Sequence, residues 1–162
     1  MTRKKTLRER GQFKKEIHSA LYKSADIREL LLGDTSGMSA VKTMEAFKDH
    51  VKSHLFIDDT ITDATTYIFY DVIMPELRAQ TKHCQVIMYL ICHRDILDNY
   101  EKDGYIGDRI DILSQMVEDA LINDDDRVNK FGIGNLDITD VGFYNASRFY
   151  GCIITFEVTS FR

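Results

Sequence analysis

The spacing of apolar residues changes near Thr65, and this change constrains the fold more than any other feature. Before it, apolar residues recur at the spacing of amphipathic helices, as in Phe13, Ile17 and Leu21. After it, runs rich in β-branched and aromatic residues indicate strands. A chain that is helical in its first third and mostly strand afterwards is typical of an α+β layer structure.

Three helical segments are expected in the first third. The first contains Phe13 and Ser24 at helical spacing. A second, short helix begins at Asp26 and Glu29, which have the spacing of a capping box, and ends at Gly33. The third begins at Ser39 and follows the helical spacing of Val41, Met44, Phe47, Val51 and Leu55.

Four strands and one more helix are expected in the rest of the chain. The strands cover residues 65–72, 84–93, 133–141 and 149–161, and the helix begins at Asp103 or Gly107 and ends near Leu121. In the last strand, alternate residues face the same side: Tyr150, Cys152, Ile154, Phe156 and Val158.

The expected connections complete the topology. Pro75 ends the first strand, residues 76–82 form a polar loop, and residues 142–147 join the last two strands. The order helices-β-β-α-β-β predicts one domain, residues 1–162, with helices on one face of a four-stranded antiparallel sheet.

Charge is distributed unevenly along the chain. Residues 1–15 carry seven bases and one acid, a net charge of +6, whereas the remaining 14 bases and 25 acids give −11. The acidic body argues against broad nucleic-acid binding. We expect residues 1–15 to form a basic arm that contacts an acidic neighbouring copy, with nucleic acid or an acidic membrane surface as alternatives. Its bases are Arg3, Lys4, Lys5, Arg8, Arg10, Lys14 and Lys15.

The residues that can bind metals do not form a site by spacing. Cys84 and Cys92 lie about 26 Å apart along one strand, too far for one zinc ion. His50 and His54 have helical zinc-ligand spacing but supply only two ligands. We therefore expect no metal or other cofactor. The three cysteines, an odd number in apolar segments, indicate buried free thiols.

Two groups of acidic residues are considered, one as a contact loop and one as a catalytic metal site. Asp124, Asp125 and Asp126 are expected to form an acidic loop that is solvated or contacts a basic partner. Catalysis by a metal-dependent nuclease would require acids that converge on a metal ion. The acids near the ends of elements are not linked by any such spacing: Asp71, Asp95, Asp98 and Asp108.

The chain shows no sign of a membrane-spanning segment or of common catalytic motifs. Its longest strictly apolar run, Val86 to Cys92, has seven residues, whereas a spanning helix needs about 20. The sequence contains neither a G-x-S-x-G nor a C-x-x-C motif. We expect no membrane partner and no enzymatic activity.

Five segments carry a family resemblance: TYIF (66–69), VIMYLI (86–91), GDRIDIL (107–113), FGIGNL (131–136) and YGCIITF (150–156). They resemble segments of the tail-terminator and tail-completion proteins of tailed bacteriophages. The resemblance covers most of the chain in the order of its elements, but the basic arm and the extra helix before Gly33 depart from it.

The resemblance implies a structural virion protein without catalytic residues. Six copies would form a ring at the head-proximal end of the tail, end polymerisation of the tail tube and join the tail to the neck. Its partners would be further copies, the tail tube protein and head-tail connector proteins, and DNA would pass through the lumen without specific binding. The arm and the loops at 73–82, 94–104, 123–130 and 142–148 would make the contacts.

Three alternatives follow from the same residues. One is another neck component, such as a head-closure or connector-adaptor protein. A second is the metal-dependent nuclease, and a third is a nucleic-acid-binding module that acts through the basic arm.

Overall fold

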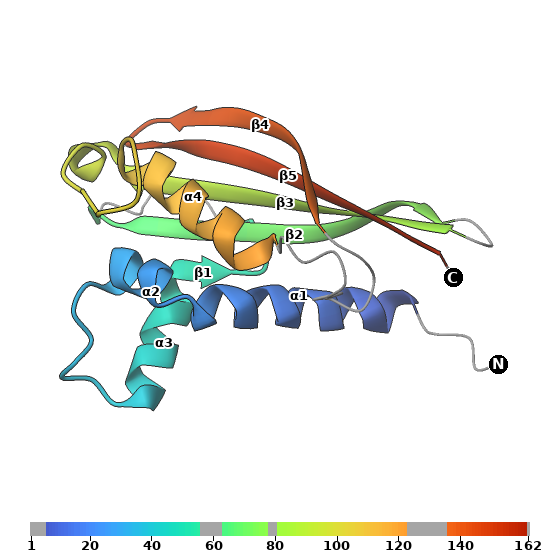
Figure 1. Cartoon of the computed structure of the whole chain (residues 1–162), viewed down its shortest axis with the longest axis horizontal. Helices are drawn as coiled ribbons and strands as arrows, with labels where there is room; N and C mark the ends of the chain where they lie inside the picture. The colour runs from blue at the N-terminus through green and yellow to red at the C-terminus, as the bar shows by residue number, and fades with distance from the viewer. Residues whose placement is uncertain (1–5, 56–62, 78–80, 123–135, 162) are drawn as a thin grey trace.

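The computed structural model describes residues 6–55, 63–77, 81–122 and 136–161 (Figure 1). Its helices are α1 (Thr6–Lys23), α2 (Ala25–Leu32), α3 (Ala40–His50), the 3-10 turn η1 (Arg94–Ile96) and α4 (Arg109–Leu121). Its strands are β1 (Val51–Lys52), β2 (Thr66–Leu77), β3 (Thr81–His93), β4 (Asp137–Ala146) and β5 (Phe149–Phe161).

The α+β class is confirmed, but the sheet differs from the prediction. It contains five strands in the order β1-β2-β3-β5-β4. The short β1 runs parallel to β2, and the other neighbours are antiparallel. The sheet is therefore mixed, with an added parallel strand at one edge.

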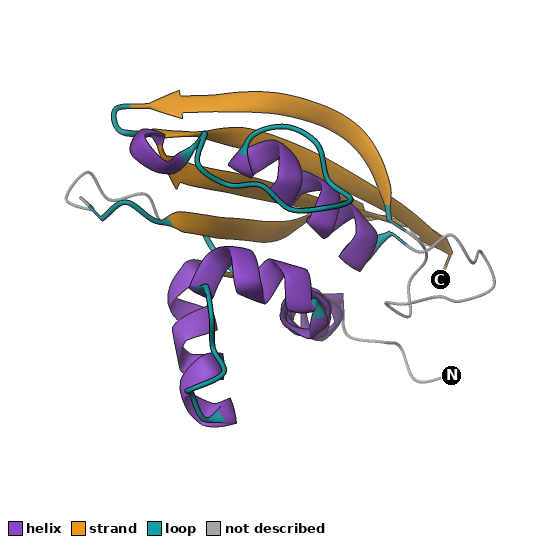
Figure 2. Ribbon diagram, turned by 60° about the vertical axis from the view of Figure 1, so that its left-hand side comes forward, coloured by secondary structure: helices purple, strands orange, loops and turns teal. Residues whose placement is uncertain are grey.

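The helices cover one face of the sheet, and the core lies between them (Figures 1 and 2). The predicted alternation of the last strand is confirmed, because Ile154 and Phe156 are buried while Tyr150 packs against the same core. Phe13 and Ile17 of α1 are buried on the helical side.

The predicted extension of the third helix to Leu55 is wrong. Helix α3 ends at His50, and Val51 and Lys52 pair with Ile68 and Phe69 instead. The apolar spacing misled because a strand can bury Val51 as well as a helix can: this side chain is 3% exposed, whereas Leu55 is 51% exposed.

Two predicted connections are also strands. Strand β2 continues through Pro75, where a register shift between Ile73 and Glu76 accommodates a residue that has no backbone N–H. Strand β4 continues through Gly142 to Ala146, because Gly142 pairs with Ile153 in the ladder. The tight turn that follows contains Ser147, at a φ of 53°.

The helix starts show which polar residue supplies the cap. Ser24, not Asp26, caps α2 through a hydroxyl that accepts from the N–H of Ile27 at 3.3 Å. Asp108 caps α4 in a reciprocal capping box with Asp111. In the segments that the structure describes, no helix is long and apolar enough to cross a membrane.

Candidate interaction surface

Strand β4 forms an open edge of the sheet. It pairs with β5, and no other described strand pairs with its outer side (Figure 1). Edge strands are commonly protected by charged residues, proline, a β-bulge or a covering element. The start of β4 has Asp137, Asp140 and a register shift between Ile138 and Asp140, whereas residues 141–146 contain no charged residue, no proline and no register shift. The backbone of residues 141–146 is therefore available to pair with another chain.

Two apolar side chains project from this edge. Val141 is 63% exposed and Phe143 is 77% exposed. They lie opposite Ile154 and Cys152 in the ladder, so they share the face that carries the core but extend beyond its helical cover. We call them the Val141–Phe143 pair. Exposed apolar residues of this size beside a free backbone edge are typical of a docking surface.

The opposite edge is blocked. There β1 covers part of β2, and side chains bind two outward carbonyls of β2. The Nδ1 of His50 lies 2.8 Å from the Thr66 oxygen and must donate to it, and Arg10 Nε donates to the Val72 oxygen at 2.6 Å. This edge is therefore closed to a strand from another chain.

Two bases of the predicted arm hold α1 against the blocked edge. Arg10 and Lys14 contact the carboxylate of Asp71 at 2.8 and 2.6 Å, and Lys14 also donates to the Ser53 oxygen at 3.0 Å. Burial acts to raise the pKa of Asp71. The hydrogen bond from Lys14, the backbone N–H of Val72 and the two positive charges outweigh it and lower that pKa below its ordinary value.

The predicted basic arm is thus helical from Thr6 onward. Arg10 and Lys14 bind an acid of their own chain, where the sequence predicted an acidic neighbour. Arg8 and Lys15 are exposed on the same helix. Arg3, Lys4 and Lys5 lie outside the described residues, as do Asp124, Asp125 and Asp126.

The face of the sheet away from the helices carries an aromatic patch. It comprises two stacked rings, a T-shaped pair and two buried neighbours: Tyr67, Phe69, Tyr89, Tyr144, Ile91 and Phe149. Tyr67 and Phe69 stack with centroids 5.5 Å apart. The helices lie on the other side of the sheet (Figure 2), and of their residues only His50, at the end of α3, has a described ring contact with this patch, because it stacks on Tyr67 with centroids 5.7 Å apart. The rings shield one another, and the partly buried tyrosines offer amphipathic contacts to a partner.

The cysteines and histidines of β3 serve the fold. Cys84 and Cys92 are buried free thiols, and burial raises the pKa of Cys92 to about 12. His83 lies 3.3 Å from Glu157, and His93 caps η1 by accepting from the N–H of Asp95. No three His, Cys, Asp or Glu side chains of the described residues lie close enough to hold a metal ion.

The acids considered for a nuclease are distributed over separate structures. Asp71 is engaged by α1, and Asp108 caps α4. Asp95 and Asp98 are exposed at and after η1. No described group of these acids converges on one point.

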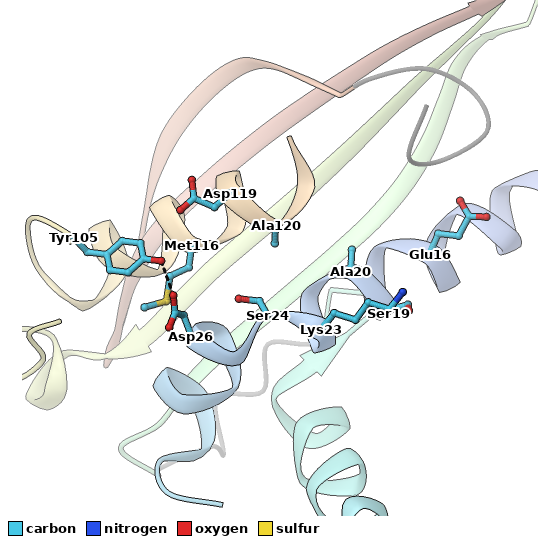
Figure 3. Close-up of a pocket in the computed structure, with 10 residues that line it drawn as sticks. All are labelled: Glu16, Ser19, Ala20, Lys23, Ser24, Asp26, Tyr105, Met116, Asp119 and Ala120. Carbon is cyan, nitrogen blue, oxygen red and sulfur yellow. Dashed lines mark hydrogen bonds between the residues drawn. The ribbon is translucent and has the colours of Figure 1, made fainter. Parts of the chain in front are cut away.

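A pocket of about 540 Å³ opens between α1 and α4 (Figure 3). Tyr105 donates to Asp26 at its rim at 2.7 Å, which lowers the pKa of Asp26 and raises the pKa of Tyr105 to about 12. Lys102 bridges Asp26 and Glu29. These contacts attach the segment before α4 to α2, so they give this region a structural role.

Sequence reasoning placed Phe143 in the contact loop 142–148 but missed that Val141 and Phe143 belong to one edge strand. It assigned Val141 to the end of a strand and Phe143 to a connection, because glycine at 142 resembles a break. The signal was the alternation of apolar residues across that glycine, which continues the strand.

Comparison with known proteins gives one match. A family model named YomW matches residues 15–158. Searches of curated proteins and of solved structures find no match. The matched residues include strands β1 to β4, all of β5 except its last three residues, and the second half of α1. The chain therefore belongs to the YomW family, which is phage-derived.

Proposed function

We propose that this protein is a structural virion subunit that assembles with its own copies into a ring at the head-proximal end of a phage tail. There it ends polymerisation of the tail tube and joins the tail to the neck proteins. The phage-derived family and the resemblance of five segments to tail-terminator proteins support this role. The observation that carries it is the open β4 edge with the Val141–Phe143 pair.

The two unlike edges favour a head-to-tail contact. A strand of one copy cannot extend the sheet of the next at β2, because β1, His50 and Arg10 occupy that edge. The β4 edge can therefore pair with the β4 edge of a second copy about a two-fold axis, which gives a dimer, or dock on a different surface of its neighbour; the proposed ring requires the second arrangement. Contacts between unlike surfaces generate rings when the rotation closes.

The Val141–Phe143 pair supplies much of the driving force. Full burial of such a side chain stabilises an interface by about 1.5–3 kcal/mol. Backbone hydrogen bonds along the β4 edge add direction and register to the contact. The two contributions together suit an interface that is repeated around a ring.

The experiment measures mass and shape together. Mass photometry across protein concentrations, with negative-stain imaging of the assembled fraction, is expected to show an annulus. Phe143→Lys is expected to abolish it. Val41→Lys is the matched control, because Val41 is 67% exposed on α3 and its replacement removes an equally exposed apolar residue elsewhere.

Other outcomes separate the parts of the proposal. If the protein forms a two-fold dimer and Phe143→Lys dissociates it, the docking surface is supported but the ring is rejected. A chain that stays monomeric with tail tube protein and in assembled particles would reject both.

A further inference from the structure

A second pocket, distinct from the proposed docking surface, is lined by basic side chains. It has a volume of about 520 Å³ and lies where α1 meets the end of α3 and β1. Its polar lining comes from α1, from the end of α3 with β1 and the two residues after it, and from β2: Lys14, Lys15, His18, Lys48, Lys52, Ser53, His54 and Tyr70. No carboxylate lines it among the described residues.

Three of these lysines have no counter-charge in the described structure. Lys14 is committed to Asp71 and the Ser53 oxygen. Lys15, Lys48 and Lys52 form no ion pair with any residue that the structure describes. Like charges that converge on one hollow repel each other, and a bound anion relieves that repulsion.

The pKa of His18 reflects its burial and the positive charge around the pocket. Its ring packs edge-on against Phe47 at 5.5 Å, so the side chain is held in place. Burial and then the charge of Lys48 lower the pKa of His18. The imidazole is therefore mostly neutral at pH 7 and can offer one N–H to an anion.

We propose that this pocket binds a phosphate-bearing anion. A tetrahedral phosphate has oxygens directed to several sides, and lysines line this pocket from α1 on one side and from α3 and β1 on the other. Lysine is a common phosphate ligand as a compact positive charge. The volume lies within the range of small-ligand pockets, about 300–1,000 Å³.

Two sources could supply this phosphate, a free anion or a nucleic-acid backbone. The lysines gather in one hollow instead of following a stripe along a face, which favours a compact anion. The basic pocket and the proposed docking surface on β4 share no residue, so this inference does not depend on the proposed function.

The test is titration with pyrophosphate at low salt, followed by calorimetry and by the NMR signals of His18. The double variant Lys48→Gln/Lys52→Gln is expected to weaken pyrophosphate binding by about tenfold or more. Lys42→Gln is the matched control, because Lys42 is exposed on α3 and does not line the pocket. It should leave the affinity within about twofold.

His18 provides a second readout that does not depend on affinity alone. Bound pyrophosphate should raise its pKa, since a nearby negative charge stabilises imidazolium. This rise should disappear in the double variant, whose folding is checked by circular dichroism.

Competition with a short DNA duplex separates the two sources. If DNA does not displace pyrophosphate, the site takes a free anion; if DNA displaces it and the double variant loses both, the site takes backbone phosphate. The proposal is overturned if pyrophosphate leaves the His18 signals unchanged, or if a glutamate-rich peptide binds as tightly.

Discussion

The two edges of the sheet are built in opposite ways. At the β2 edge, β1 adds a parallel strand and Arg10 binds the outward carbonyl of Val72. At the β4 edge, no described strand pairs with the outer side of Asp137–Ala146, and Val141 and Phe143 are exposed. The contacts at the β2 edge show that this chain can protect an edge of its sheet, so the β4 edge could have been protected in the same way. This difference is the reason that the proposed docking surface is placed at β4.

The largest expected effect comes from Gly151, which attaches the half of the sheet that carries the open edge. A Cβ at this position would lie 1.9 Å from the Leu90 oxygen of β3, so Gly151→Ala should force β5 away from β3. We expect a loss of about 3 kcal/mol or more in the free energy of unfolding, measured by urea denaturation.

Gly142→Ala is the control for this prediction. Gly142 lies on β4, and a Cβ there meets no atom within 4 Å. The free energy of unfolding of Gly142→Ala should stay within about 0.5 kcal/mol of that of the parent protein. Equal losses in the two variants would contradict the role assigned to the close approach at Gly151.

The next effect concerns the open edge itself. Val141→Lys/Phe143→Lys removes two exposed apolar side chains and adds charges that protect an edge strand. Self-association should weaken by about a hundredfold, measured by sedimentation over a range of concentrations. The unfolding transition should hardly change, and a large loss of stability would show that these residues serve the fold.

A smaller effect is expected at the blocked edge. Arg10→Ala removes the bonds to Val72 and Asp71, and since the Arg10 side chain is 36% exposed, we expect a loss of only about 1 kcal/mol. Arg8→Ala, on the exposed part of α1, is the control. If Arg10 protects the edge, its variant should also aggregate faster on heating, as followed by light scattering.

The smallest effect is the pH dependence of the same contact. The pKa of Asp71 is lowered from 3.8 in the folded state, so its contribution is complete above the unfolded pKa and is lost as the pH falls through the folded one. Asp71→Asn should therefore reduce the loss of stability between pH 7 and pH 3. If the stability of Asp71→Asn and of the parent protein changes equally with pH, the ion pairs of Asp71 with Arg10 and Lys14 do not contribute to stability.

The sequence predicted those elements whose pattern is local. The apolar spacing of α4 and the alternation of β5 repeat over many residues, and both were found, although α4 begins at Arg109 and leaves Ile106 exposed. Val51 forms a strand because it pairs with β2, which lies later in the chain, so the helical spacing around Val51 could not exclude a strand. Likewise, the spacing of Arg10 and Lys14 gave no sign of Asp71, because their meeting is a property of the folded chain.

The exposed strand β4 also limits how long a newly made subunit can safely stay alone. An uncovered strand edge is a template for irregular stacking with any extended chain. In the proposed ring, neighbouring copies cover this edge, so subunits that have not yet joined a ring are the ones exposed to irregular stacking.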